Sequence, residues 1–154
     1  MWYLLLKTIH IISSTLLFGT GLGSAYYMWR AHLTGKIPVI ATTVKHVVTA
    51  DWLFTSTTII IQLVTGIWMV LLANYSFTWS WILWSLLLYG LAGACWLPVV
   101  WIQLKIRDLE QQAVLTDTHL PPLYYRYMRL WFLLGWPAFI SLVVVFGLMV
   151  FKPI

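Results

Sequence analysis

The sequence predicts an all-α integral membrane protein, a four-helix up-down bundle with both termini outside. Its composition is the first indication, because 62% of the 154 residues are hydrophobic and only 8% are charged. Soluble domains carry about 25% charged residues. The mean hydropathy of +0.89 points the same way. Four apolar stretches each supply the roughly 20 residues that a membrane span requires.

The predicted spans share an apolar interior and a border of Trp or Tyr, and they cover residues 2–29, 52–73, 79–104 and 130–151. Rings such as those of Trp2, Trp52, Trp79 and Trp131 are typical of the headgroup level of a bilayer. The first apolar stretch has no basic region before it and no small-residue cleavage site after it. We therefore expect a retained helix rather than a signal peptide, and a single transmembrane domain over residues 1–154.

The loops predict the orientation of the chain. Seven of the nine Lys and Arg residues fall in the predicted loops 30–51 and 105–129, and the short connection at 74–78 has no charge. The positive-inside rule places the two basic loops in the cytoplasm and both termini outside. We therefore expect a multi-pass protein of the bacterial inner membrane. The net charge of +5 reflects this topology, and no nucleic-acid partner is expected.

Parts of the two basic loops are themselves predicted to be helical. Helix-like patterning begins at about Pro38 and continues past the third span over residues 106–114. Pro121 and Pro122 then break the chain, and a new helix is expected from Tyr124.

Lys7 and His10 are the ionisable residues inside the first span. They are three residues apart, so they share one face of a helix, and such residues within a membrane are functional candidates. His10 lies roughly 10 Å from the outer face at about 1.5 Å per residue. The other histidines fall on the cytoplasmic side, which excludes a bis-histidine haem within one chain. Met69 and Met149 share the leaflet of His10.

His10 with Met69 or Met149 is therefore the one metal-ligand set that the topology permits, for haem iron or for copper. Structural roles compete with this interpretation. The imidazole would then be hydrogen-bonded across helices, and the methionines would pack. Lys7 would extend its ammonium group to the interface.

Four other polar residues each have two possible partners or roles. Asp51 is expected to cap a helix or to pair with a loop arginine, and Gln62, near the bilayer centre, needs a serine or a backbone carbonyl on another span, with Ser85 a candidate by depth. Arg126 and Arg129 are one turn apart. They fit contact with anionic lipids or an anchor for an acidic ligand such as a porphyrin propionate.

Small residues suggest how the helices associate. Gly19 with Gly23, and Gly90 with Gly93, form faces that let helices approach closely, within the chain or between protomers. Besides the lipid bilayer, a homo-oligomer or a larger membrane complex is thus a candidate partner. The single Cys95 excludes an intramolecular disulfide. No Ser–His–Asp, Cys–His or intramembrane carboxylate pair can be placed, so the sequence leaves open whether the protein is an enzyme.

Two family resemblances follow from these motifs. Lys7-Thr8-Ile9-His10-Ile11, with the glycines and Arg30 that follow, resembles the first span of HemJ-type protoporphyrinogen oxidases and the related CopD-like copper-resistance membrane proteins. A match along nearly the whole chain is to the bacterial membrane family named domain of unknown function 2269 (DUF2269). The segments that carry it are Asp51-Trp52, Trp96-Leu97-Pro98-Val99-Val100, Gly135-Trp136-Pro137-Ala138-Phe139 and the C-terminal Leu148 to Pro153.

The HemJ resemblance implies a haem b or a porphyrin near His10, in the outer half of the bundle, with a redox or haem-handling role. Lys7, Met69, Met149 and the pair Arg126 and Arg129 are the other candidate contacts of that cofactor. HemJ-type proteins also have a lysine in a later span, and the later spans here have none in their interiors. The alternatives are a non-catalytic accessory or assembly subunit of a membrane complex and, from the CopD resemblance, copper handling.

Overall fold

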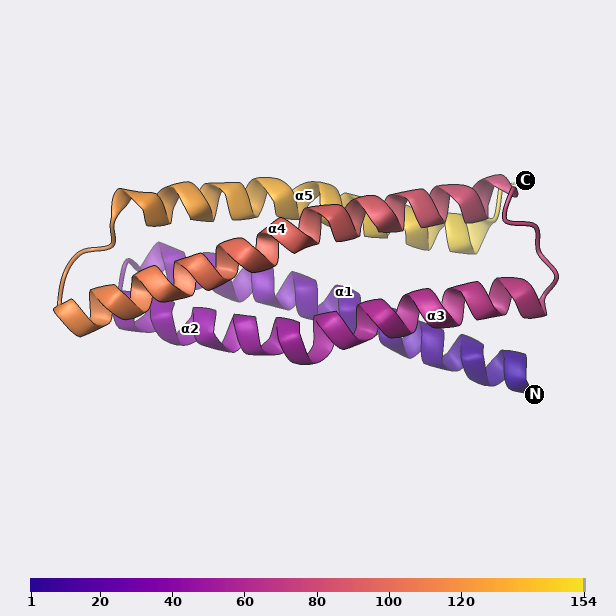
Figure 1. The fold of residues 1–154 in the computed structure, drawn as a ribbon, viewed down its shortest axis with the longest axis horizontal. Helices are drawn as coiled ribbons and strands as arrows, with labels where there is room; N and C mark the ends of the chain where they lie inside the picture. Colours follow the sequence, from indigo (N-terminus) through magenta and orange to yellow (C-terminus); the bar gives the residue numbers. More distant parts are fainter. Residues whose placement is uncertain (154) are drawn as a thin grey trace.

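The computed structural model describes residues 1–153 and confirms the all-α bundle (Figure 1). Its elements are α1 (Trp2–Thr34), α2 (Ile37–Ala50), the π-helical turn η1 (Asp51–Thr55), α3 (Ser56–Leu72), α4 (Ser80–Thr116) and α5 (Pro122–Phe151). Because α2, η1 and α3 are continuous, the described chain has four long helical stretches. Each of them is long and apolar enough to cross a membrane.

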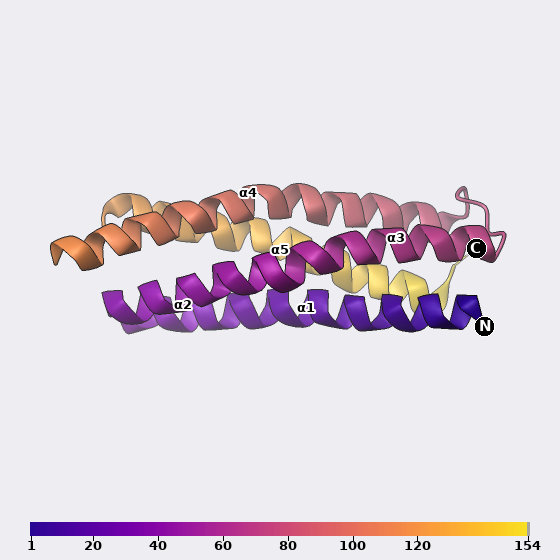
Figure 2. The same cartoon turned by 60° about the horizontal axis from the view of Figure 1, so that its bottom comes forward.

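The helices form two antiparallel pairs. α1 packs along α3, and α4 packs along α5, while α2 bridges the two pairs by contacting α1 and α4. Both termini and the connection between α3 and α4 lie at one end of the molecule, and the other two connections lie at the opposite end (Figures 1 and 2). This is the predicted up-down arrangement.

The helices are longer than a bilayer is thick. At about 1.5 Å per residue the 37 residues of α4 extend roughly 55 Å, whereas the hydrocarbon core measures about 30 Å. The exposed side chains show where the excess lies. Lys45 and His46 are exposed on α2, whereas Trp52 and Phe54 are exposed just after it. This pattern agrees with the boundary expected from the sequence, near Asp51, and we expect α2 to lie beyond it.

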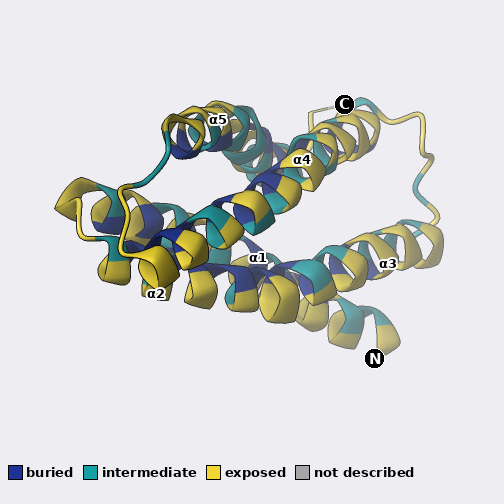
Figure 3. Cartoon of the chain, turned by 60° about the vertical axis from the view of Figure 1, so that its left-hand side comes forward, coloured by how far each residue is buried: buried dark blue, intermediate teal, exposed yellow. Residues whose placement is uncertain are grey.

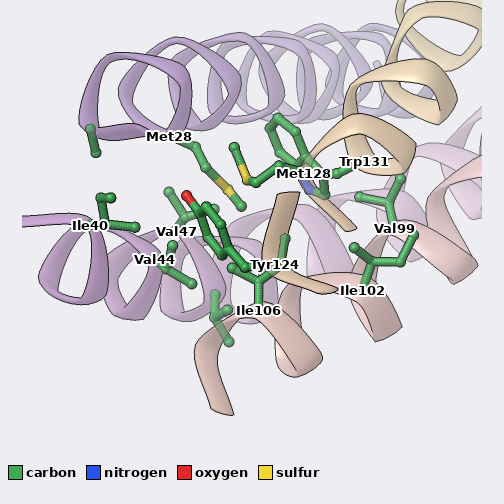
Figure 4. Close-up of a cluster of buried hydrophobic side chains, with 12 residues drawn as sticks. Met28, Ile40, Val44, Val47, Val99, Ile102, Ile106, Tyr124, Met128 and Trp131 are labelled. Atoms are coloured by element: carbon green, nitrogen blue, oxygen red, sulfur yellow. The ribbon is translucent and has the colours of Figure 1, made fainter. Parts of the chain in front are cut away.

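We call the part of the molecule beyond this boundary the projecting end; it consists of α2 and the adjoining ends of α1, α4 and α5. The predicted loops 30–51 and 105–129 are thus mostly helical. The largest buried cluster lies in or next to this end (Figure 4) and contains Met28, Ala31, Ile40, Val44, Val47, Val48, Val99, Ile102, Ile106, Tyr124, Met128 and Trp131. Helix α2 contributes apolar residues at spacings of three and four, which is the pattern of an amphipathic helix.

Elsewhere the outward faces of the helices are exposed and apolar, as Figure 3 shows by the exposed colour along every helix. Of the small-residue faces, Gly19 and Gly90 are exposed, whereas Gly23 and Gly93 are half-buried. An added Cβ at Gly19, Gly23, Gly90 or Gly93 would meet no other atom of the described residues within 4 Å, apart from the helix's own backbone. Close helix packing at these glycines within the chain, one of the two predicted uses, is therefore not present.

Candidate functional site

His10 lies between α1 and α3, where its side chain is only 7% exposed. Its Nδ1 is 2.8 Å from the Thr65 hydroxyl oxygen, and its Nε2 is 2.8 Å from Nε2 of Gln62. An amide nitrogen only donates, so Nε2 of His10 accepts that bond. The proton of the neutral ring is then on Nδ1, which donates to Thr65. Both ring nitrogens are therefore engaged with α3.

The hydrogen bonds around His10 form a closed network. The Thr65 hydroxyl donates to the backbone oxygen of Ile61 at 2.6 Å, and the Ser13 hydroxyl donates to Oε1 of Gln62. Gln62 thus finds its partners on α1. The predicted partner, Ser85, instead donates to a carbonyl oxygen of its own helix. We call His10, Ser13, Gln62 and Thr65 the polar network.

Gly66 makes the approach of the His10 ring possible. A Cβ built at Gly66 would lie 3.2 Å from Cε1 of His10, which is tighter than most real contacts. The ring therefore lies directly against the backbone of α3, within hydrogen-bond distance of its neighbours. Among the described glycines, this is the one at which an added Cβ would meet another residue within 4 Å.

None of the other predicted ligands makes a hydrogen bond to this network among the described residues. Lys7 is exposed and takes no part in it, and Met69 and Met149 are half-buried. For His10 to bind a metal together with either methionine, the Gln62 amide would first have to release Nε2. Among residues 1–153 there is no group of three or more His, Cys, Asp or Glu side chains that could hold a metal ion. Metal ligation by His10 stays a prediction, and it requires that the Gln62 amide release Nε2 of His10.

Asp51 is a second buried polar centre, 6% exposed and located in η1. Its Oδ1 accepts from the Thr55 hydroxyl at 2.9 Å, and its Oδ2 accepts from Nε2 of Gln103 at 2.8 Å. The helical backbone continues through Asp51, so this residue does not cap the start of a helix. It also forms no ion pair with an arginine among the described residues. The two roles predicted for Asp51 are therefore wrong. Single π-turns occur frequently at functional sites.

A cavity of about 290 Å³ lies between the two helix pairs, with Asp51 and Gln103 in its wall. We call it the central cavity. Its wall is mostly apolar and includes the aromatic residues Phe18, Tyr89, Trp96, Trp131, Phe132, Trp136 and Phe139. Leu22 on α1 and Trp136 on α5 line it and are also exposed on the exterior. The cavity therefore opens toward lipid between α1 and α5.

The indole groups of Trp96 and Trp131 are notable in this wall. Neither Nε1 has a hydrogen-bond partner among the described residues, and both atoms are buried. Buried donors in native proteins are nearly always paired. Trp131 was predicted to be a ring at the headgroup level, whereas the structure buries it in the core and in the cavity wall.

Glu110 is a buried carboxyl group that the sequence interpretation missed. It is 0% exposed, and neither carboxylate oxygen has a hydrogen-bond partner within residues 1–153. Its position on α4, about 9 Å beyond Leu104, places it in the projecting end. Burial raises its pKa to about 8. The i, i+4 spacing from the buried Ile102 and Ile106 is the signal that could have placed it on the inner face.

The predicted basic pair remains at the surface. Arg126 and Arg129 are both exposed, and the single ion pair in the described chain joins Arg107 and Asp108 at 3.1 Å. The roles expected of the pair, contact with anionic lipid or with an acidic ligand, stay predictions.

A bundle of four membrane-length helices, with a hydrogen-bonded polar network between two of them, defines an integral membrane protein. The chain belongs to the family described as "Predicted integral membrane protein (DUF2269)", which matches residues 4–153 and confirms the family predicted from the sequence. No curated protein and no solved structure matches the chain. The resemblance to HemJ-type and CopD-like proteins stays a hypothesis.

Proposed function

We propose that this protein is a binding protein of the bacterial inner membrane, whose central cavity holds a largely apolar, lipid-soluble molecule. The observation that carries the proposal is the cavity itself, which is mostly apolar, walled by all the spans and open toward lipid between α1 and α5. Concave, mostly apolar sites with few polar groups are typical of small-molecule sites, and they occur between the helices of bundles.

The polar atoms of the wall limit the chemistry of the ligand. Asp51 and Gln103 already bond to each other, and Tyr89 donates to a backbone oxygen of α3 at 2.9 Å. A strongly polar ligand would be buried without partners, which is unfavourable. The buried donors of the wall that have no hydrogen-bond partner within residues 1–153 are the indole groups of Trp96 and Trp131 and the hydroxyl of Ser24. An aromatic molecule with one carbonyl or hydroxyl oxygen fits this wall best.

The size of the cavity limits the part of the ligand that is enclosed. Its volume of about 290 Å³ is roughly twice that of an engineered cavity of about 150 Å³ that binds benzene. The enclosed part is therefore about the size of two fused aromatic rings. A longer molecule would extend through the opening between α1 and α5 into the bilayer.

The test uses two matched probes, naphthalene and 1-acetylnaphthalene, with the protein in lipid nanodiscs and empty nanodiscs as background. Equilibrium dialysis is expected to show one saturable site that prefers 1-acetylnaphthalene. Gly135→Phe fills the cavity and should weaken binding at least tenfold, whereas Gly90→Phe, on the exterior, should not. Trp96→Phe combined with Trp131→Phe should reduce the preference for the carbonyl. Equal, non-saturable uptake by wild type and Gly135→Phe would refute the proposal.

The haem-handling role predicted for His10 is a second candidate, supported by the burial of the ring at a polar site within a span. Haemin titrated into the same nanodiscs should then give a Soret band that His10→Ala abolishes and Gly135→Phe retains. Copper handling would instead appear as bound copper without porphyrin. If the protein takes up neither haemin nor copper, both the haem-handling and the copper-handling hypotheses are contradicted.

The non-catalytic accessory role is favoured by a different observation, the open faces at Gly19 with Gly23 and at Gly90 with Gly93. Faces of small residues allow close contact with another membrane helix. Gly19→Leu and Gly90→Leu should then change the proteins that co-purify while leaving probe and haemin uptake unaltered. If the set of co-purifying proteins does not change, these faces contact lipid only.

A further inference from the structure

A groove separate from the central cavity runs between α1 and α2. Its volume is about 710 Å³, and it receives Arg30 from α1 and His46 from α2. Hydroxyl groups of Tyr27, Thr34 and Thr43 line the same groove. We call it the α1–α2 groove. Two nitrogen-bearing side chains from facing helices thus line one space, and the hydroxyls of Thr34 and Thr43 beside them already donate to carbonyl oxygens of their own helices.

The charge of the groove is positive. None of the four acidic residues of the chain lines it, and Arg30 forms no ion pair or side-chain hydrogen bond within the described residues. Arg30 is exposed, as is His46. A guanidinium group without a partner, beside an imidazole that can donate, suits an anion, and arginine binds phosphate oxygens with two parallel hydrogen bonds.

The depth of the groove matches that of a lipid headgroup. Arg30 directly follows the exposed Trp29, and His46 lies six residues, or about 9 Å, beyond the exposed Trp52. The headgroup layer on each side of the hydrocarbon is roughly 5–8 Å thick, from total and core thicknesses of about 40–45 Å and 30 Å. His46 therefore lies at the water-facing edge of the headgroup layer, from which its side chain can reach a lipid phosphate.

The other end of the groove lies deeper, at the level of the acyl chains. Thr20 and Gly23 line it along α1, and Thr20 is ten residues, or about 15 Å, from Arg30. Phe54 supplies an apolar wall opposite them from η1. A free phosphate would use only the basic end, whereas a phospholipid would fill the whole length.

We infer that the α1–α2 groove binds one anionic phospholipid, with its phosphate between Arg30 and His46 and an acyl chain along Gly23 and Phe54. Anionic lipids enrich the cytoplasmic leaflet, which is the side on which the loop charges place these residues. The site is independent of the function proposed for the central cavity, because neither basic residue lines that cavity.

The first test is native mass spectrometry of delipidated protein with phosphatidylglycerol or phosphatidylcholine added. Wild type should retain one phosphatidylglycerol at least fivefold better than phosphatidylcholine. Arg30→Gln and His46→Gln should each lose this preference. Arg126→Gln removes an exposed arginine that does not line the groove and should keep it. Equal loss in Arg126→Gln, or no preference in wild type, would overturn the inference.

The second test separates a lipid from a free phosphate. Gly23→Leu fills the deep end of the groove without altering a charge, and a Cβ there meets no other atom of the described residues within 4 Å apart from its own helix, so folding should be preserved. This variant should lose phosphatidylglycerol at least fivefold. Inorganic phosphate at millimolar concentration should compete weakly. Full displacement by phosphate, with Gly23→Leu behaving as wild type, would show a phosphate site instead and overturn the lipid assignment.

Discussion

Gln62→Leu is the substitution that tests the polar network most directly. The leucine has nearly the same size and remains apolar toward lipid, but it removes both hydrogen bonds between α3 and α1 that Gln62 makes. The Ser13 hydroxyl keeps a partner, because it also lies 3.0 Å from the backbone oxygen of His10. Nε2 of His10 keeps none. The variant therefore leaves one buried acceptor unpaired.

The expected cost follows from these two effects. Interhelical hydrogen bonds in membrane proteins average about 0.6 kcal/mol, so two contribute roughly 1.2 kcal/mol. An unsatisfied buried acceptor costs about 1–3 kcal/mol. Since the two effects overlap, we expect Gln62→Leu to lower the free energy of unfolding by about 1–3 kcal/mol. His10→Phe with Gln62→Leu should cost less than the sum of the single variants, because it removes the unpaired group.

The assay is reversible unfolding in mixed micelles, followed by circular dichroism as the denaturing detergent increases. Thr57→Ala serves as the control, because Thr57 is exposed and bonds only to its own helix. It should change the free energy of unfolding by less than about 0.5 kcal/mol. A Gln62→Leu variant as stable as this control, or strictly additive effects in the double variant, would refute the network as an interhelical link.

Three further outcomes can be measured in the same assay. Gln103→Leu should destabilise by about 1–3 kcal/mol, because it leaves one buried oxygen of Asp51 unpaired, and stability equal to wild type would contradict this. Gly66→Val should displace the His10 ring and cost about as much as Gln62→Leu, since each breaks the bond between His10 and Gln62 and one further bond between α1 and α3; a clearly smaller cost would show that the ring accommodates the side chain. The stability of the wild type should fall as the pH rises from about 4.5 to about 8, because burial raises the pKa of Glu110 to about 8 in the folded state. Glu110→Gln should reduce this fall in the free energy of unfolding by up to a few kcal/mol. An unchanged fall would show that Glu110 is ionised when folded.

The four-span architecture could be predicted because it depends on local properties. A stretch of about 20 apolar residues is recognised without knowledge of its neighbours, and the flanking charges set its direction. His10 could be singled out for the same reason, as an ionisable residue within such a stretch. The same reasoning predicted the helical continuation past the third span and the restart near Tyr124.

The partners of the polar residues could not be predicted in this way. Ser85 was predicted as a partner of Gln62 because the two residues lie at a similar depth in the membrane. In the structure Gln62 instead bonds to His10 and Ser13 on α1. The choice depends on which helices are neighbours, and the polar face of α3 reaches α1 while α4 pairs with α5. Asp51 was likewise expected to cap a helix or to pair with a loop arginine, because the continuous π-turn in which it contacts Gln103 has no signature in the sequence.

What the sequence by itself determined is therefore a membrane protein with four spans, a basic end and a polar residue at His10. Only the tertiary structure decided that His10 is held at both nitrogens, that the helices leave the central cavity between their two pairs, and that Glu110 faces inward. The physical reason is that lipid solvates apolar helix surfaces as well as another helix does. Hydropathy therefore specifies that a segment crosses the membrane, whereas hydrogen bonding and shape specify which helix it meets.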